Sequence, residues 1–235
     1  MIDDIRINKA PTGDRLGDPK IAQKLLYAHI LLDRSGSMES IRESAIDGVN
    51  EYIGSLANDK EVDSRISLTI FDSSGIDLIR DNIDAGRCAP LRGDEFQPRA
   101  MTPLNDAIGR TIAEIEAGTR RDGENVAFII LTDGLENASH EYNRAAIKAL
   151  LERVQKEKNW LVLYLGANQD AFQEGVAHRG TTHGHTMQYD THNVANVMKT
   201  SARSSLSFAS TGSNVAASVD FTDEERAKAS AKPKT

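Results

Sequence analysis

Four side chains that carry oxygen donors are placed so that they could hold a metal ion together. Two are aspartates and two are serines, namely Asp33, Ser35, Ser37 and Asp133. Hard divalent cations take oxygen ligands, and Mg²⁺ in particular keeps several waters and few direct carboxylates. The set therefore suits Mg²⁺, with Mn²⁺ or Ca²⁺ as alternative occupants of the same site.

The two aspartates each follow a short apolar segment. Leu25–Leu32 ends at Asp33, and Val126–Leu131 is followed by Thr132 and then Asp133. Neither segment alternates with polar residues, which is typical of strands covered on both faces. In a doubly wound sheet, ligands bind outside the carboxyl ends of the strands, at the crevice where the winding reverses. If the two strands are neighbours, both carboxylates point into one crevice.

The elements that must position these residues alternate between helix and strand. We expect helices over 41–56, 103–116, 141–158, 169–177 and 193–201, and strands over 66–71, 76–79, 160–165 and 186–189. The turn at 72–75 joins two of these strands as a hairpin. The predicted fold class is α/β, a three-layer, doubly wound and mostly parallel sheet with one antiparallel edge strand, as in Rossmann-like proteins.

One core accounts for most of the chain. The 235 residues are 39% hydrophobic but only 5% aromatic, so the core should consist mainly of aliphatic side chains. We expect a domain over 22–203, preceded by an N-terminal extension over 1–21. The segment 204–235 is rich in Ser, Ala, Gly and Asn and is predicted to be a flexible tail or a docking arm. Within it, Thr222 and Glu225 have the spacing of a capping box.

The composition excludes several classes of function. With 28 Lys and Arg against 35 Asp and Glu, the net charge of -7 argues against nucleic acid as a partner. The single cysteine, Cys88, rules out an intramolecular disulfide and a thiolate-rich zinc site. No segment has the length needed to cross a bilayer, so no membrane partner is expected. The expected location is cytoplasmic, or virion-associated if a phage encodes the protein.

The chemistry-bearing residues also resemble a known family. Asp-Arg-Ser-Gly-Ser at 33–37 is similar to the Asp-x-Ser-x-Ser signature of von Willebrand factor A domains that carry a metal-ion-dependent adhesion site. Thr102 resembles the threonine that this family places on a second loop, and Asp133 resembles its final aspartate. The likeness covers roughly 22–200 in motif order. Gly166–Asp170 is further similar to bacterial and phage members related to tellurite-resistance proteins.

The resemblance implies roles for the five side chains. Ser35, Ser37 and, in some states, Thr102 would touch the metal directly, while Asp33 and Asp133 would act mainly through water. The incomplete coordination shell would then accept an Asp or Glu from a protein partner. This implies a metal-dependent protein-binding module and not an enzyme. Ala100-Met101 departs from the family, because many members carry glycines before the threonine.

Two other functions stay open at this point. The chain could be a structural subunit of a phage particle or of a multiprotein complex, in which the metal only pins loops. Less favoured is a Mg²⁺-dependent, phosphatase-like hydrolase with Asp33 as nucleophile. It lacks a second aspartate at the expected spacing, a nucleophile elbow and a phosphate-binding loop.

Several other residues favour simpler interpretations. Asp72 and Asp106 are expected to cap a turn and a helix, and Cys88 to be an unreactive thiol. Arg-Gly-Asp at 92–94 is a tripeptide that recurs by chance in loops. Four histidines could approach one another as zinc or nickel ligands, but a polar loop around 180–184 is the favoured interpretation. They are His178, His183, His185 and His192.

Overall fold

A single six-stranded sheet organises the chain in the computed structural model, which describes residues 24–118, 120–167, 185–211 and 219–231. The strands lie in the order β3-β2-β1-β4-β5-β6. β3 pairs antiparallel with β2 at one edge, and all other neighbours are parallel, so the predicted fold class is confirmed. Their bounds are β1 Lys24–Asp33, β2 Val62–Asp72, β3 Gly75–Asp84, β4 Asn125–Thr132, β5 Leu161–Gly166 and β6 Thr186–Gln188.

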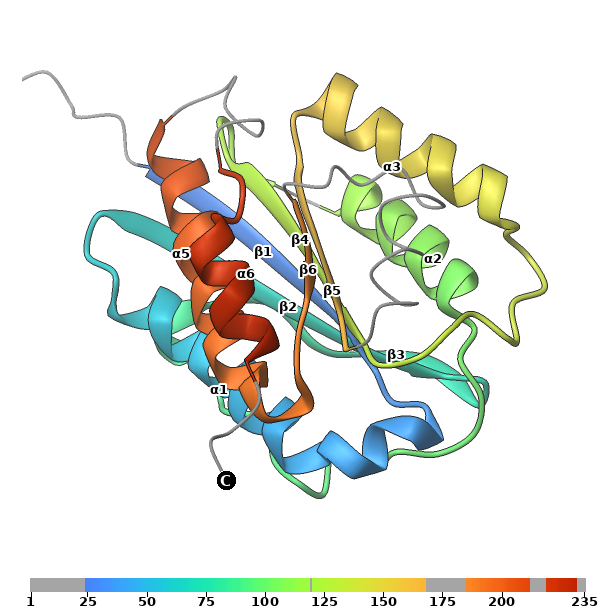
Figure 1. Cartoon of the computed structure of the whole chain (residues 1–235). Coiled ribbons are helices and arrows are strands. Elements are labelled where there is room, and N and C mark those ends of the chain that lie inside the picture. Colours follow the sequence, from blue (N-terminus) through green and yellow to red (C-terminus); the bar gives the residue numbers. More distant parts are fainter. Residues whose placement is uncertain (1–23, 119, 168–184, 212–218, 232–235) are drawn as a thin grey trace, which may run out of the picture.

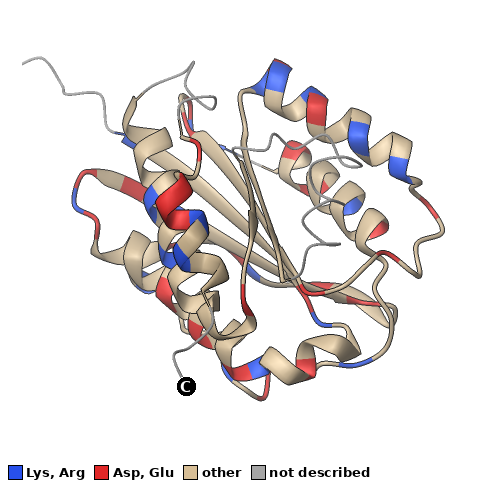
Figure 2. Ribbon diagram, viewed as in Figure 1, with Lys and Arg blue, Asp and Glu red and all other residues tan. Residues whose placement is uncertain are grey.

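Helices cover both faces of the sheet. Helices α1, α5 and α6 lie on one face and α2 and α3 on the other (Figure 1). The helices are α1 Arg42–Asn58, α2 Leu104–Ala117, α3 Arg144–Lys158, α5 Val194–Thr211 and α6 Asp223–Ser230, with short 3-10 turns η1 Gly36–Ile41, η2 Ala85–Arg87 and η5 Thr191–Asn193. Lys and Arg are interspersed with Asp and Glu along the helices (Figure 2). None of the described helices combines the length and apolarity needed to cross a membrane.

Strand β1 is apolar along most of its length, and the buried polar residue in its middle, His29, has hydrogen-bond partners in Tyr27 and Thr69. Leu26 and Ile30 pack into the core beneath α1 and α5, whereas Tyr27 and Leu31 pack into the core beneath α2 and α3. Successive side chains of a strand point to opposite faces, so a strand between two helical layers needs apolar residues on both faces. β1 therefore runs through the middle of the protein, and its last residue, the polar Asp33, lies at one edge of the sheet.

The helix expected over 193–201 continues to Thr211, so the predicted end was wrong. Its serines do not interrupt the helix, because Ser201 and Ser205 donate to the carbonyl oxygens of Val197 and Ser201, both at 2.9 Å. Tyr52 on α1 also donates to Ser205 Oγ at 2.8 Å. Polar helix residues that are satisfied in this way can face a core.

The described part of 204–235 packs against the sheet. Val219, Phe221 and Ala229 are buried in the same core as α5, and the predicted capping box of Thr222 and Glu225 begins α6. The hairpin strands are also longer than expected, since β3 extends to Asp84 with side chains that are mostly exposed or half-buried. The helix expected over 169–177 lies outside the described residues.

A pair of glycines in α1 tests the contact between α1 and α5. A Cβ added at Gly48 would lie 2.8 Å from Val194 Cγ1 and 3.3 Å from the Val194 carbonyl carbon, whereas nothing lies within 4 Å of one added at Gly54. We expect Gly48→Ala to destabilise the protein by about 1 to 3 kcal/mol, because the overpacked side chains must shift.

The matched variant Gly54→Ala should stabilise by up to about 1 kcal/mol, since Ala is the better helix former. Urea unfolding of both variants measures the difference in the free energy of unfolding. A Gly48→Ala variant as stable as Gly54→Ala would mean that α5 does not pack closely on α1.

Candidate metal centre

The carboxyl ends of β1 and β4 bring the two aspartates to one edge of the sheet. These strands are parallel neighbours, with Leu32 paired to Leu131, so the chain leaves both strands at the same level. Asp33 is fully buried, whereas Asp133 is partly exposed. The site therefore has one carboxylate inside the protein and one at its surface.

Four of the five predicted residues are linked by direct hydrogen bonds. The Ser35 amide donates to Asp33 Oδ1 at 2.7 Å, and Ser37 Oγ donates to Asp133 Oδ1 at 2.7 Å. The hydroxyl oxygens of Ser35 and Ser37 lie 3.1 Å apart. The loop after β1 thus folds back over its own aspartate and reaches across to the aspartate after β4.

Thr102 reaches the same place from a separate loop. A Cβ added at Gly134 would lie 3.5 Å from Ser37 Oγ and 3.6 Å from Thr102 Oγ1, so the two hydroxyls border one small space. The Thr102 backbone is held by Asn137, which donates its amide to Thr102 O at 3.1 Å and accepts from Thr102 N at 2.8 Å. All five side chains named from the sequence therefore converge.

Thr132 belongs to this arrangement, although sequence reasoning did not select it. Its hydroxyl donates to Asp33 Oδ2 at 2.7 Å. The Asp33 carboxylate therefore accepts one hydrogen bond on each oxygen, from Ser35 and from Thr132. The available signal was the strand pairing, because the residue after Leu131 on β4 must lie beside the residue after Leu32 on β1.

Arg34 fastens the first loop to the β2–β3 hairpin. Its Nε donates to Asp72 Oδ2 at 2.7 Å and its Nη2 to Asp77 Oδ2 at 2.8 Å, and Arg99 Nε also reaches Asp72 Oδ2 at 3.0 Å. Asp72 accepts from the Ser74 amide, as a turn cap should. Burial raises the pKa of Asp72, but these hydrogen bonds outweigh that effect and leave the pKa below its usual value.

Asp106 anchors the loop that follows β4 and does not cap its own helix, α2. Its carboxylate accepts from the backbone amides of His140, Glu141 and Tyr142 at 2.8 to 3.0 Å. The expectation of a helix cap was therefore wrong, because the loop after β4 passes directly above the start of α2. Glu136 adds a second clamp by accepting from the amides of Asn105, Ala138 and Ser139.

Both site carboxylates are costly to ionise where they lie. Burial raises the pKa of Asp33 to about 6, although its hydrogen bonds from Thr132 and Ser35 oppose the shift. Burial also raises the pKa of Asp133, against the hydrogen bond from Ser37. A bound divalent cation would offset this cost, because it favours the ionised form of both groups.

The donor set fits a hard cation. Two carboxylates and three neutral hydroxyls supply only oxygen, and the partial exposure of Asp133 leaves access for water. Among the residues that the structure describes, no group of three or more His, Cys, Asp or Glu is placed to bind a metal. Soft-metal chemistry of the zinc or nickel type thus finds no support in the described part of the chain.

The other candidate groups have internal partners. Burial raises the pKa of the Cys88 thiol, which opposes reactivity, and Arg92 pairs with Asp94 of the same tripeptide at 3.0 Å. His185 is buried and His192 is hydrogen-bonded to Asp190, while the remaining histidines of the proposed group, His178 and His183, lie outside the described residues.

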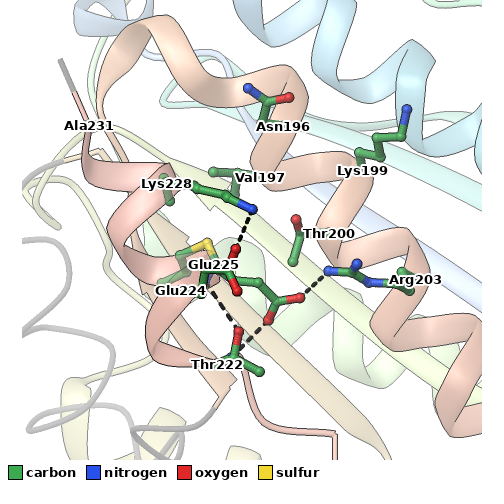
Figure 3. A pocket seen from close by; sticks show the side chains of 12 residues that line it. Asn196, Val197, Lys199, Thr200, Arg203, Thr222, Glu224, Glu225, Lys228 and Ala231 are labelled. Atoms are coloured by element: carbon green, nitrogen blue, oxygen red, sulfur yellow. Dashed lines mark hydrogen bonds and ion pairs between the residues drawn. The ribbon is translucent and has the colours of Figure 1, made fainter. Parts of the chain in front are cut away.

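A pocket of about 600 Å³ between α5 and α6 includes none of the five site residues (Figure 3). Its charged side chains form ion pairs with one another, Arg203 with Glu225 and Lys228 with Glu224. Lys199, at its rim, pairs with Glu51 on α1. Each charged side chain that lines the pocket is therefore paired, and the pocket presents no unbalanced charge for a ligand.

Solved structures share this architecture. The chain is similar to the von Willebrand factor type A protein from Catenulispora acidiphila (TM-score 0.55, 12% identity, 77% of this chain and 42% of that one). It is also similar to the manganese-loaded TRAP protein of Plasmodium vivax (0.52, 16%, 77% and 74%). A third is the pilus adhesin SpaC from Lactobacillus rhamnosus GG in its open conformation (0.59, 16%, 77% and 30%).

The TM-scores show that these proteins share the fold of this chain, and at 12 to 16% identity the similarity shows the fold alone. The chain spans less than half the length of the first and third of these proteins. No family model matches the sequence. No curated protein matches it either.

Asp33→Asn is expected to stabilise the cation-free protein at about pH 7.5. The folded-state pKa of Asp33 lies above its unfolded value, so its carboxyl contributes stability that is complete below about pH 4 and lost as the pH rises through about 6. Asn is never charged and keeps an acceptor for the Ser35 amide. Urea unfolding in EDTA should show a gain of up to about 3 kcal/mol.

The gain should fall to well under about 1 kcal/mol near pH 4, where the wild-type carboxyl is protonated in the folded state and about half protonated in the unfolded state. Asp47→Asn, at an exposed position of α1, is the control and should change the free energy of unfolding by less than about 0.5 kcal/mol. If Asp33→Asn is less stable than wild type in EDTA at neutral pH, the ionised Asp33 carboxylate does not destabilise the folded protein and the prediction is wrong.

Proposed function

We propose that this chain, which has the fold of von Willebrand factor type A domains, is a module that binds a protein partner through a divalent cation. One observation carries the proposal. Two aspartates and three hydroxyl residues that are distant in the sequence meet at one edge of the sheet. Hydrogen bonds link Asp33 to Ser35 and Ser37 to Asp133, and the hydroxyl of Thr102 borders the same space.

Each side chain has a separable task in the proposed site. Ser35 and Ser37 would hold the cation directly with Thr102, because their hydroxyls border the same space. Asp33 and Asp133 would balance its charge, mainly through water. The cation, when bound, supplies an electrophilic position for a carboxylate of the partner. Asp33 is fully buried, so only the outer side of the site is open to that carboxylate.

Similar proteins support both parts of the proposal. One solved structure of this fold is described as manganese-loaded, and another as a pilus adhesin. These descriptions favour a divalent cation and protein binding over catalysis. Mg²⁺ is our preferred cation because the donors are all oxygen and few are charged. We propose no hydrolytic activity, because Asp33, the candidate nucleophile, is fully buried and hydrogen-bonded on both oxygens.

Calorimetric titration of Mg²⁺ and Mn²⁺ tests the site. We expect wild type to bind one cation, and the double variant Ser35→Ala, Ser37→Ala to lose at least about tenfold in affinity, because two neutral ligands are removed. Circular dichroism and urea unfolding check that the variant keeps its fold.

The matched control is Ser55→Ala, Ser207→Ala, which removes two hydroxyls from α1 and α5 and includes none of the site residues. It should bind both cations as wild type does. Equal heats in wild type and in the Ser35, Ser37 variant would remove the basis for the proposed function.

A further inference from the structure

Large apolar side chains border the proposed cation site. Among the residues that the structure describes, Leu78, Met101 and Leu135 are exposed, at 42%, 51% and 45%. Met101 directly precedes Thr102, and Leu135 lies two residues after Asp133. Exposed apolar side chains that gather at a site mark a surface for binding, whereas scattered ones need no explanation.

The loop that carries Met101 is fixed on both sides. Ser73 donates its amide to Met101 O at 3.0 Å, and Met101 N donates to Ser73 Oγ at 3.1 Å. The preceding residue, Ala100, is hydrogen-bonded to the Gly36 amide and has a φ of 59°, a conformation that glycine adopts far more readily. These bonds fix the backbone of Met101, so little backbone entropy is lost when a partner contacts its side chain.

Leu135 is presented by an equally constrained segment. Glu136, its neighbour, turns its carboxylate inward to the amides of Asn105, Ala138 and Ser139. On its other side, Gly134 N donates to Thr132 Oγ1 at 3.2 Å. The exposure of Leu135 thus results from how the loop is anchored.

Several exposed residues on the described loops at the site are uncharged. Ser37, Ala100 and Asn137 are exposed on the three loops that carry the site residues. Exposed charged residues that flank them in the described part of these loops include Glu39 and Arg99, whose guanidinium is paired with Asp72. On these loops, a partner residue beside the cation would therefore meet apolar or neutral groups.

A groove lies beside Met101, and none of the five site residues lines it. It has a volume of about 430 Å³, and its lining combines apolar residues with polar and charged ones. The apolar residues are Ile76, Met101, Pro103 and Ala138, and the charged ones include Asp106 and the ion pair of Arg110 with Glu141. Met101 is therefore the residue that joins the apolar part of this groove to the loop of Thr102.

We propose that the partner presents an Asp or Glu that is flanked by large apolar residues, with the carboxylate on the cation and the apolar side chains on Met101 and Leu135. This inference rests on the proposed function and adds the chemistry of the partner to it. Charge complementarity selects the acid, and the uncharged rim disfavours charged residues beside it.

Synthetic peptides of equal length test the inference. Their centres are Leu-Glu-Leu, Ser-Glu-Ser and Leu-Gln-Leu in the same Gly-Ser context, and binding is measured by NMR titration into full-length protein with Mg²⁺ or EDTA. We expect the Leu-Glu-Leu peptide to bind about tenfold more tightly than Ser-Glu-Ser in Mg²⁺, because it buries apolar area on the rim. The Gln peptide should not bind through the cation.

The variant Met101→Ser, Leu135→Ser should lose the preference for flanking leucines and keep its affinity for Mg²⁺ and for the Ser-Glu-Ser peptide. The matched control is Leu78→Ser, because Leu78 is also an exposed large apolar residue but lies on β3. This variant should keep the preference for flanking leucines.

Three outcomes separate the hypotheses. Equal, Mg²⁺-dependent affinity for both acidic peptides would overturn the inference and leave the proposed function intact. Absence of Mg²⁺-dependent binding by either acidic peptide would overturn both. A preference for flanking leucines that persists in the Met101, Leu135 variant would place the apolar contact elsewhere and so overturn the assignment of this rim.

Discussion

Two carboxylates at the ends of neighbouring parallel strands are the constraint on which this structure depends. β1 and β4 are central strands covered on both faces, so Asp33 ends in a position from which water is excluded. A buried carboxylate is tolerated only when hydrogen bonds or a counter-charge compensate it. Thr132 and the Ser35 amide supply the hydrogen bonds, and the raised pKa of Asp33 shows that they compensate only part of the cost.

The surrounding loops are organised by other carboxylates that serve the backbone. Asp72, Asp106 and Glu136 each accept hydrogen bonds from amides of a loop at this edge of the sheet. Arg34 connects the first of these loops to the hairpin through a buried ion pair. Such anchoring keeps the hydroxyls in place before any ligand arrives, which lowers the entropy lost on binding. These three acidic residues thus serve to hold the loops at this edge of the sheet.

The elements that position the site could be predicted because they depend on local patterns. Uniformly apolar runs identify β1 and β4, and the residues that follow them identify Asp33 and Asp133. The role of Thr132 was not predicted, although the pairing of β1 with β4 places it beside Asp33. The role of Arg34 could not be predicted, because its partner Asp72 lies far away in the sequence and becomes a neighbour only in the folded sheet. The serines of α5 led to a predicted helix end that was too early, because the sequence does not show that Tyr52 and the helix carbonyls are their hydrogen-bond partners.

The loop before Thr102 bears on whether such a site can change its affinity by moving. Displacing this loop from the other two would break the bonds from the Gly36 amide to Ala100, from Ser73 to Met101 and from Asn137 to Thr102. Each is worth about 1 kcal/mol net, and a ligand can drive a rearrangement only by the difference in its affinity for the two states. Releasing the left-handed Ala100 would return about 1 kcal/mol. The observed position of this loop is therefore its lower-energy arrangement, and in the proposed function it would keep Thr102 and Met101 fixed beside the cation.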